Sequence, residues 1–376
     1  MPSLRGASTL VLQLLSAFSL INFVIANTTS EVTVRSGQSI QAAIDAAQPY
    51  TKIIIERGIY KEQLIITKDG IELFGKPLAR LYHPDVYTNN ACSGIAGLTV
   101  DVFGTPITPQ TPAQNGICVI GEVVFGEFDT DHLKVQQDKT TRYVKDVKIS
   151  GLEVKGFTGA NIIVVGGENT LVEKNQLLEG QRYGFLTLGS KNTKFQKNGV
   201  IGTGPSGVAY IAVCNDDVSN AMIWNNEVEK YLIGLCVQTN GADIRGNHVS
   251  ETCYGTFVDP GVDGAQIRWN HVRKTFSQCP VYGIESIGIN LAGAINTEVR
   301  WNHVQEISAY GVPGFTGIGI RVVDYKGVAS GNKIRDNYLK LNDLDIQNIA
   351  TGSGNEFKNN QCTITYPAGY CKVPAA

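Results

Sequence analysis

The sequence predicts an all-β fold, a right-handed parallel β-helix (a solenoid) with a short N-terminal capping helix. Three observations predict it: an apolar motif around an asparagine recurs at regular intervals, the composition favours strands and turns, and an amphipathic segment precedes the first repeats. The 376 residues include 41 Gly and only 2 Met, and the 43% that are hydrophobic can fill one large core. We expect a single β-helix domain over residues 27–376.

The recurring motif is an apolar residue, two variable residues, an Asn, one further residue and Val or Leu. Its asparagines are Asn175, Asn198, Asn226, Asn247, Asn270, Asn302, Asn337 and Asn360. A period near 23 residues suits one coil of three short strands, and regular coils are expected over 144–365. We expect each Asn to adopt the left-handed backbone of a bend and to hydrogen-bond to the Asn of the next coil. An antiparallel sandwich, the alternative, would not need an Asn at the same phase eight times.

The segments before these coils are expected to close and extend the solenoid. Residues 39–47 place apolar side chains at helical spacing, so the region 31–48 is predicted to hold a helix that caps the open end. Strands are expected over 52–56 and 63–67. Residues 76–143 are less regular, and we expect two coils with long loops there. The longest steps between motif asparagines indicate loop insertions, which gather on one face in solenoids.

The N-terminus indicates export. Residues 1–26 carry Arg5, an apolar stretch and small or apolar residues at the expected cleavage positions, which predicts a signal peptide and a secreted protein. A signal anchor is the alternative. Asn27 would begin a glycosylation sequon.

The eight cysteines permit disulfides in an exported chain, and the spacing of six of them indicates staples within or between coils. The cysteines expected to pair are Cys92 with Cys118, Cys253 with Cys279, and Cys362 with Cys371.

Composition and motifs also limit the possible partners. A formal net charge of −2 offers no basic field for nucleic acid, and no segment beyond the signal peptide is suited to crossing a membrane. No zinc, haem or nucleotide motif is present, so we expect no cofactor, with Ca²⁺ left open. The expected state is a monomer that binds a polysaccharide or a small-molecule substrate.

One outward column on the strands is the predicted catalytic centre. Taking the apolar residues at alternate positions as inward places Gln238, Asp259, Glu285 and Arg321 in solvent on successive coils. Carboxylates one coil apart would lie roughly 5 Å apart, close enough to raise the pKa of one and make it a general acid. Asp259, Glu285 and Arg321 are therefore predicted to be catalytic, the arginine neutralising a sugar carboxylate or an oxyanion. The alternative is a solvated ladder of salt bridges.

Substrate-binding residues are predicted around this centre and on a second column. The first group comprises Arg182, Asp216, Asp217, Gln238, Tyr254 and Tyr282, the tyrosines acting as stacking surfaces. The second column is a basic strip next to the motif asparagines, formed by Arg245, Arg268, Arg300 and Arg335 with His248, His271 and His303. Arg245, Arg268, His248 and His271 of this strip would bind an acidic polysaccharide. Alternatively, the charges only keep this face soluble, with Trp269 and Trp301 filling the corner.

The segment 39–47, the Gly-x-Tyr-x-Glu element at 58–62 and the Asn repeats resemble the pectin lyase-like superfamily over residues 31–365. The resemblance implies the β-helix fold. The catalytic motifs of pectin methylesterases and polygalacturonases have no counterpart here, although Asp216 and Asp217 are similar to the paired Asp of the latter. The segment 254–260 is similar to a mannuronan epimerase motif but lacks its His.

These observations favour a secreted carbohydrate-active enzyme acting on polysaccharide, with a lyase, epimerase or hydrolase of uronate-containing chains as the leading expectation. Two alternatives remain open. One is an isomerase or cyclase of a small secondary metabolite, which would need an apolar pocket. The other is a non-catalytic glycan-binding or cell-surface protein.

Overall fold

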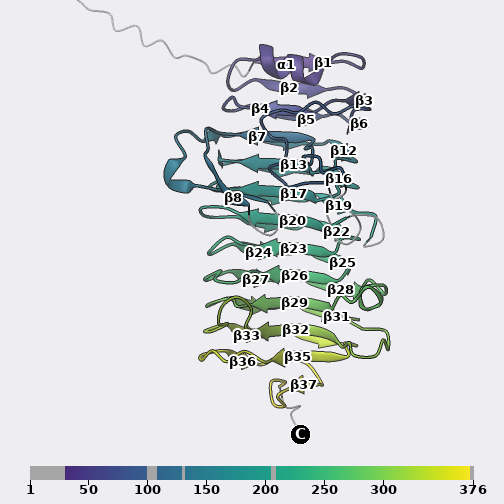
Figure 1. Ribbon diagram of the computed structural model, residues 1–376, viewed down its shortest axis with the longest axis vertical. Coiled ribbons are helices and arrows are strands. Elements are labelled where there is room, and N and C mark those ends of the chain that lie inside the picture. Colours follow the sequence, from purple (N-terminus) through teal and green to yellow (C-terminus); the bar gives the residue numbers. More distant parts are fainter. Residues whose placement is uncertain (1–29, 100–107, 129–131, 205–208, 373–376) are drawn as a thin grey trace, which may run out of the picture.

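The computed structural model describes residues 30–99, 108–128, 132–204 and 209–372. These residues form a right-handed parallel β-helix, in which strands from successive coils stack along the long axis (Figure 1). The capping helix lies at one end of the stack and the last strands at the other. The predicted fold class is confirmed. The predicted signal peptide and Asn27 lie outside the described residues.

Three long parallel sheets form the faces of the solenoid. Sheet A has twelve strands, and its strand order follows the chain. They are β1 (Glu31–Val34), β2 (Lys52–Ile55), β5 (Glu72–Gly75), β11 (Lys148–Ser150), β15 (Leu171–Glu173), β18 (Lys194–Gln196), β21 (Met222–Trp224), β24 (Asp243–Arg245), β27 (Gln266–Arg268), β30 (Glu298–Arg300), β33 (Lys333–Arg335) and β36 (Glu356–Lys358).

Sheets B and C follow sheet A in every regular coil, so each coil contributes one strand to each face. Sheet B comprises β3 (Gly58–Lys61), β6 (Ala79–Tyr82), β12 (Glu153–Lys155), β16 (Gln176–Leu178), β19 (Gly199–Ile201), β22 (Glu227–Glu229), β25 (His248–Thr252), β28 (His271–Thr275), β31 (His303–Gln305) and β34 (Tyr338–Lys340). Sheet C comprises β4 (Leu64–Ile66), β7 (Ile117–Ile120), β13 (Ala160–Val165), β17 (Tyr183–Leu188), β20 (Ile211–Asp216), β23 (Ile233–Val237), β26 (Tyr254–Val258), β29 (Ser286–Ala292), β32 (Gly317–Val323), β35 (Leu344–Asn348) and β37 (Thr365–Tyr366).

The core runs the length of the solenoid because each strand points alternate apolar side chains inward. In sheet A, Ile223, Ile244 and Ile267 occupy one register position on successive coils, and all are almost fully buried. In sheet B, Val228 and Val249 stack in the same way. Buried columns of this kind fix the register, since a slip by one residue would turn each apolar set into solvent.

The motif asparagines form one continuous ladder inside the bend between sheets A and B. Asn247, for example, donates from its side-chain amide to Oδ1 of Asn270 at 3.0 Å, and Asn270 donates to Asn302 at 3.1 Å. The same bond joins every neighbouring pair of the eight, from Asn175 to Asn360. The predicted ladder is confirmed.

The conformation predicted for the ladder asparagines is wrong by one residue. The preceding residue adopts the left-handed backbone: Lys197 has φ 55°, Trp269 φ 53° and Asp336 φ 55°. The Asn itself points inward, and its backbone N–H donates to the Asn side chain of the next coil, as in the 3.0 Å bond from Asn247 to Asn270. The bend therefore depends on two adjacent positions, one strained and exposed, one relaxed and buried.

The N-terminal cap is a helix of two turns, α1 (Ile40–Ala46). Ser39 is its N-cap and accepts a hydrogen bond from the Ala42 backbone, while Ile40 and Ile44 are buried against the first coil. The helix therefore covers the apolar end of the core, as predicted. Strand β1 within the same region was not expected; it pairs with β2 and forms the first rung of sheet A.

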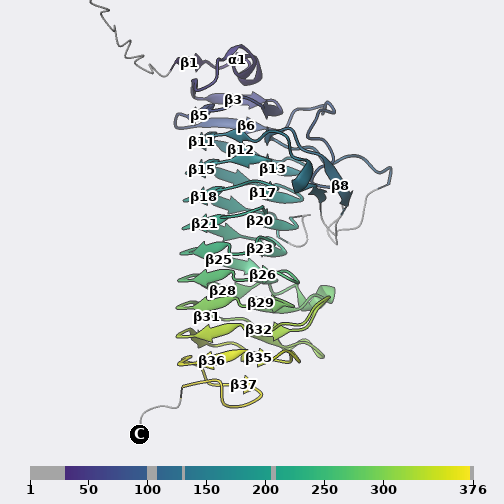
Figure 2. The same ribbon diagram turned by 90° about the vertical axis from the view of Figure 1, so that its left-hand side faces the viewer.

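Residues 76–143 contain one incomplete coil rather than the two expected. Strands β6 and β7 belong to sheets B and C, and the other described residues form two excursions, before and after β7. The second excursion holds the antiparallel pair β8 (Phe125–Phe128) and β9 (Leu133–Val135) and the 3₁₀ turn η1 (Gln137–Lys139). It projects from the side of the solenoid (Figure 2), and β10 (Val144–Lys145) and β14 (Gly167–Glu168) pair after it.

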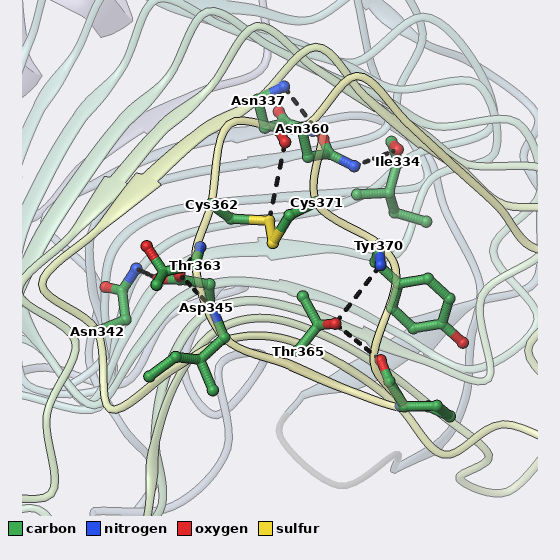
Figure 3. Close-up of a disulfide and its surroundings, with 12 residues drawn as sticks. Ile334, Asn337, Asn342, Asp345, Asn360, Cys362, Thr363, Thr365, Tyr370 and Cys371 are labelled. Carbon is green, nitrogen blue, oxygen red and sulfur yellow. Dashed lines mark hydrogen bonds between the residues drawn. A yellow bond between two sulfur atoms is a disulfide. The ribbon is translucent and has the colours of Figure 1, made fainter. Parts of the chain in front are cut away.

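Four disulfides join the chain, and three of them are the predicted pairs. The fourth, Cys214–Cys236, links register neighbours on β20 and β23 and was missed, although its separation of 22 residues matches the repeat. The Cys362–Cys371 bridge closes the last loop beside Asn360 at the end of the ladder (Figure 3). None of the cysteines is free.

Candidate functional site

The outer face of sheet C carries a column of polar side chains where its strands end. Asn215, Val237 and Val258 pair in register on three successive coils, so the residues that follow them, Asp216, Gln238 and Asp259, are vertical neighbours. Gln238 donates a 2.5 Å hydrogen bond to Oδ2 of Asp259. The predicted adjacency of Gln238 and Asp259 is therefore present, and Asp216 extends the column by one coil.

A cleft of about 620 Å³ opens over this column. Its polar and charged lining includes all three column residues, together with Lys134, Glu285, Asn290, Arg321, Asp324 and Lys326. Its aromatic lining is Tyr210, Tyr254, Phe257 and Tyr325. The cleft thus combines carboxylates, amides, cations and flat apolar rings, which suits a polar ligand with several rings.

The predicted vertical pairing of Asp259 with Glu285 is wrong. Strand β29 begins at Ser286, and its Leu291 lies opposite Val258, so the neighbour of Asp259 on the next coil is Ala292. Glu285 precedes the strand, at the other end of the cleft face. The turn η3 (Pro280–Tyr282) and the loop around it lengthen the chain before β29, which shifts the phase that the sequence pattern had suggested.

Glu285 instead forms a bidentate ion pair with Arg321. The two N–O distances are 2.5 and 2.9 Å, and the Arg321 Nε donates to Asn290 at 2.9 Å. Arg321 shares its register position with Asn290, two residues before the column of Asp259. Its side chain is 11% exposed, so its guanidinium is mostly committed to protein partners.

Tyr254 completes this cluster by donating its hydroxyl to Glu285 at 3.0 Å. Burial and the Glu285 charge raise the pKa of Tyr254, so its hydroxyl stays protonated. Burial alone would raise the pKa of Glu285, but the hydrogen bonds and charge of Arg321 outweigh it and hold that pKa below its usual value. Glu285 is therefore an ionised wall of the cleft and has no proton to donate near neutral pH.

Asp217 does not reach the cleft, although Asp216 beside it does. The Asp217 side chain points into the solenoid, where it accepts hydrogen bonds from the Thr187 hydroxyl at 2.8 Å and the Ser190 N–H at 3.1 Å. Burial raises its pKa to about 7. The role predicted for Asp217 in substrate binding is therefore contradicted by the alternation of side chains along the strand.

Arg182 and Tyr282 also fall outside the cleft lining. Arg182 is 5% exposed, donates to the Ala96 carbonyl at 3.1 Å and lies 5.4 Å from the Tyr210 ring centroid. It binds the first excursion through Ala96 and packs against Tyr210, and it does not line the cleft. Tyr282 lies in η3, away from the column.

The predicted basic strip lies on sheets A and B, whereas the cleft is on sheet C. Its arginines are paired: Arg268 with Asp243 at 3.3 Å, Arg300 with Asp336 at 2.8 Å. Arg245 lies 3.5 Å from Asp243 and 3.8 Å from the Trp224 ring centroid. These contacts agree with the alternative of a solvated face with salt bridges.

The histidines of the strip form a column on sheet B. His248 and His271 have ring centroids 5.5 Å apart, and His271 and His303 are separated by 5.9 Å. Burial, with the neighbouring imidazoles, lowers the pKa of His271. These rings stack as any side chain repeated at one register position of a solenoid does, and none of them lines the cleft.

The sequence pattern missed two residues of the second excursion. His132 is fully buried, and its Nε2 lies 2.9 Å from Oε1 of Gln238; Lys134 lines the cleft. The segment that contains these two residues has no repeat phase, so its position over sheet C could not be predicted from spacing. Among the described residues, no cluster of three or more His, Cys, Asp or Glu side chains is arranged to hold a metal ion.

Comparisons with known proteins find likeness in structure alone. No family model matches the chain, and no curated protein does. The Dettilon tailspike protein gp208 has a TM-score of 0.50 at 13% identity, over 89% of this chain and 68% of its own. A DFA-IIIase from Arthrobacter chlorophenolicus A6, solved in complex with DFA-III, has a TM-score of 0.53 at 11% identity, over 88% of this chain and 94% of its own.

The same DFA-IIIase in another crystal structure has a TM-score of 0.54 at 11% identity, over 86% of this chain and 80% of its own.

No helix among the described residues is long and apolar enough to cross a membrane. The parallel sheets, the asparagine ladder and these neighbours agree that the chain has a right-handed parallel β-helix fold.

Proposed function

We propose that this protein is a secreted carbohydrate-active enzyme that hydrolyses a glycosidic bond in the cleft on sheet C. The observation that carries the proposal is the column Asp216–Gln238–Asp259, which places two carboxyl groups on one face of a cleft lined by aromatic rings. One carboxyl would protonate the leaving oxygen and the other would activate water. The fold likeness to carbohydrate-active proteins supports the same class of ligand.

The separation of the two carboxyl groups favours an inverting reaction. Asp216 and Asp259 lie two coils apart, which puts their backbones roughly 10 Å apart at about 4.8 Å per coil. Gln238 lies on the coil between them and donates a hydrogen bond to Asp259. Inverting glycosidases separate their carboxyl groups by roughly 6.5–9.5 Å to accommodate the attacking water.

The state of Arg321, the cation predicted for uronate chemistry, favours hydrolysis, although Lys134 and Lys326 also line the cleft. A uronate lyase or epimerase needs a cation to neutralise the sugar carboxylate, and Arg321 was the predicted one. Its guanidinium is already bound by Glu285 and Asn290. The proposed substrate is therefore a neutral glycan, whose rings stack on Tyr254, Phe257 and Tyr325.

Two other functions are less well supported by the cleft. An isomerase or cyclase of a small metabolite was expected to need an apolar pocket, whereas seven charged residues line this cleft. They are Lys134, Asp216, Asp259, Glu285, Arg321, Asp324 and Lys326. A non-catalytic glycan-binding protein would show affinity without turnover, which the following experiment detects.

The test is a screen of the purified protein against neutral and uronate-containing polysaccharides. We expect reducing ends to be released from a neutral glycan, with no unsaturated product absorbing in the ultraviolet. Asp216→Asn and Asp259→Asn should each lower kcat at least about 100-fold. Asp243→Asn, a matched change on sheet A, should not. Equal activity of the two cleft variants and the wild type would refute the proposal.

The remaining parts of the proposal concern the state of the protein. Cleavage after residue 26 and glycosylation at Asn27 can be read from the mass of the secreted chain. Four disulfides suit an oxidising compartment. A monomer without cofactor should keep its activity in EDTA, whereas loss of activity that Ca²⁺ restores would indicate a metal.

A further inference from the structure

The buried imidazole of His132 contacts Gln238, the middle residue of the column Asp216–Gln238–Asp259. His132 lies just before β9 in the second excursion, 106 residues from Gln238 in sequence, and its side chain is fully buried. Nε2 lies 2.9 Å from Oε1 of Gln238, and the Gln238 amide nitrogen lies 2.5 Å from Oδ2 of Asp259. Gln238 therefore connects a buried ring to one of the two proposed catalytic carboxyl groups.

The hydrogen-bond roles along this chain depend on one another. If the Gln238 amide N–H points at Asp259, the carboxyl accepts and is ionised, and Oε1 of Gln238 must then accept from His132 Nε2. If the amide is reversed, Gln238 donates to His132, and Asp259 must be protonated to donate to the amide oxygen. The two arrangements assign opposite roles to Asp259: base in the first, acid in the second.

The surroundings of His132 favour the first arrangement. Its other nitrogen, Nδ1, lies 3.1 Å from the Leu133 carbonyl oxygen, so both ring nitrogens face oxygen atoms. Because Nε2 faces the Gln238 oxygen, a proton on Nε2 lets the ring donate to Gln238. The amide N–H of Gln238 then points at Asp259, whose carboxylate accepts it. The charged groups that line the cleft with Asp259 are Lys134, Asp216, Glu285, Arg321, Asp324 and Lys326.

We propose that His132 is a positioning residue that acts through Gln238 to hold Asp259 as the carboxylate that activates water. This inference rests on the proposed hydrolysis and assigns its roles: Asp259 is the general base, which leaves Asp216 as the general acid. It also gives the second excursion a function, since the excursion carries the donor that orients Gln238 toward Asp259.

The first test needs no substrate. Nitrogen-15 NMR of the imidazoles, with His132 assigned by its absence in His132→Gln, should show Nε2 of His132 protonated at pH 7. A neutral ring with the proton on Nδ1 alone would overturn the inference, because Gln238 would then present its oxygen to Asp259.

The second test is the pH dependence of kcat/KM with the neutral glycan found in the screen. His132→Phe keeps a buried ring but removes both donors, so Gln238 can reverse. We expect kcat to fall at least about 10-fold at pH 6 and the acidic limb of the profile to move to higher pH, with little change in KM. His132→Gln restores a donor near the Nε2 position and should recover much of the kcat at pH 6.

The outcomes separate this inference from the function on which it rests. If Asp259→Asn remains fully active, the proposed function fails. If Asp259→Asn is inactive but His132→Phe keeps the wild-type acidic limb, only the role of His132 fails. Should His132→Phe not fold, Gln238→Leu interrupts the same connection from the solenoid side. It should produce the same shift of the limb, and an unchanged limb would contradict the inference.

Discussion

The carboxylate of Glu285 forms a bidentate ion pair with the guanidinium of Arg321, across the strands of two neighbouring coils. The pair occupies the guanidinium that was predicted to bind a uronate carboxylate. It also keeps Glu285, one of the two carboxyl groups that the sequence suggested as catalytic, ionised near neutral pH, because Arg321 lowers the pKa of Glu285 despite its burial.

Glu285→Gln should lower stability at pH 7 by about 1 kcal/mol, because Arg321 loses its charged partner and the pair is partly exposed. The folded-state pKa of Glu285 is depressed, so its contribution is present above the unfolded value and is lost as pH falls through the folded one. The free energy of urea unfolding should therefore be lower for the variant than for the wild type at pH 7, and this difference should disappear as pH falls below 4.5 through the folded-state pKa. Glu356→Gln, at an exposed position, is the control. An equally large loss of unfolding free energy in that variant would contradict the account.

Asn270→Ala should destabilise the protein by about 3 kcal/mol. The change removes one rung of the ladder, so Asn247 loses the acceptor for its side-chain and backbone N–H groups while Asn302 loses a donor, all of them buried. The measurement is the free energy of unfolding, with Gln266→Ala on the outer face of the same coil as control. If Asn270→Ala lowers the free energy of unfolding no more than Gln266→Ala does, the ladder does not contribute to stability.

Asp217→Asn should make the protein more stable at pH 8. Burial raises the folded-state pKa of Asp217 from 3.8 to about 7, so its contribution is complete below pH 4 and declines as pH rises toward 7. Above that range the charged form costs roughly 4 kcal/mol. We expect the variant to exceed the wild type by up to that amount at pH 8 and to lose the advantage at pH 4. Parallel stability curves for the two proteins would contradict a buried, protonated Asp217.

The histidine column should make stability fall as the medium becomes acidic. Burial, with His248, His303 and Arg273 nearby, lowers the pKa of His271, and Glu306 opposes this shift. The unfolded chain therefore takes up the proton first, and stability is lost as pH falls below 6.5. His271→Gln should reduce the loss between pH 7.5 and 5 by less than about 1 kcal/mol, since the ring is partly exposed. A steeper loss in the variant would contradict this account.

The sequence predicted the features that repeat. The asparagine phase, the capping helix and three disulfides follow from spacing and apolar periodicity, and the structure contains them. The bend geometry was misassigned by one residue because the motif marks both positions together. It does not show whether Trp269 or Asn270 takes the strained backbone.

The candidate site was predictable only where the repeat continues. Gln238 and Asp259 were correctly aligned because the steps between their coils contain no insertion. Glu285 was misaligned because the loop before β29 shifts the phase, and the partner of Arg321 could not be inferred from register. His132 comes from an excursion without any repeat, so only the three-dimensional structure brings it to Gln238.

The location of the bound glycan is the most direct test of the proposed site. A crystal structure of Asp259→Asn with an oligosaccharide of the preferred glycan should place a glycosidic oxygen within reach of Asp216, with sugar rings against Tyr254 or Phe257. Sugar bound instead along Arg245 and Arg268 on sheet A, with the cleft on sheet C empty, would contradict the account.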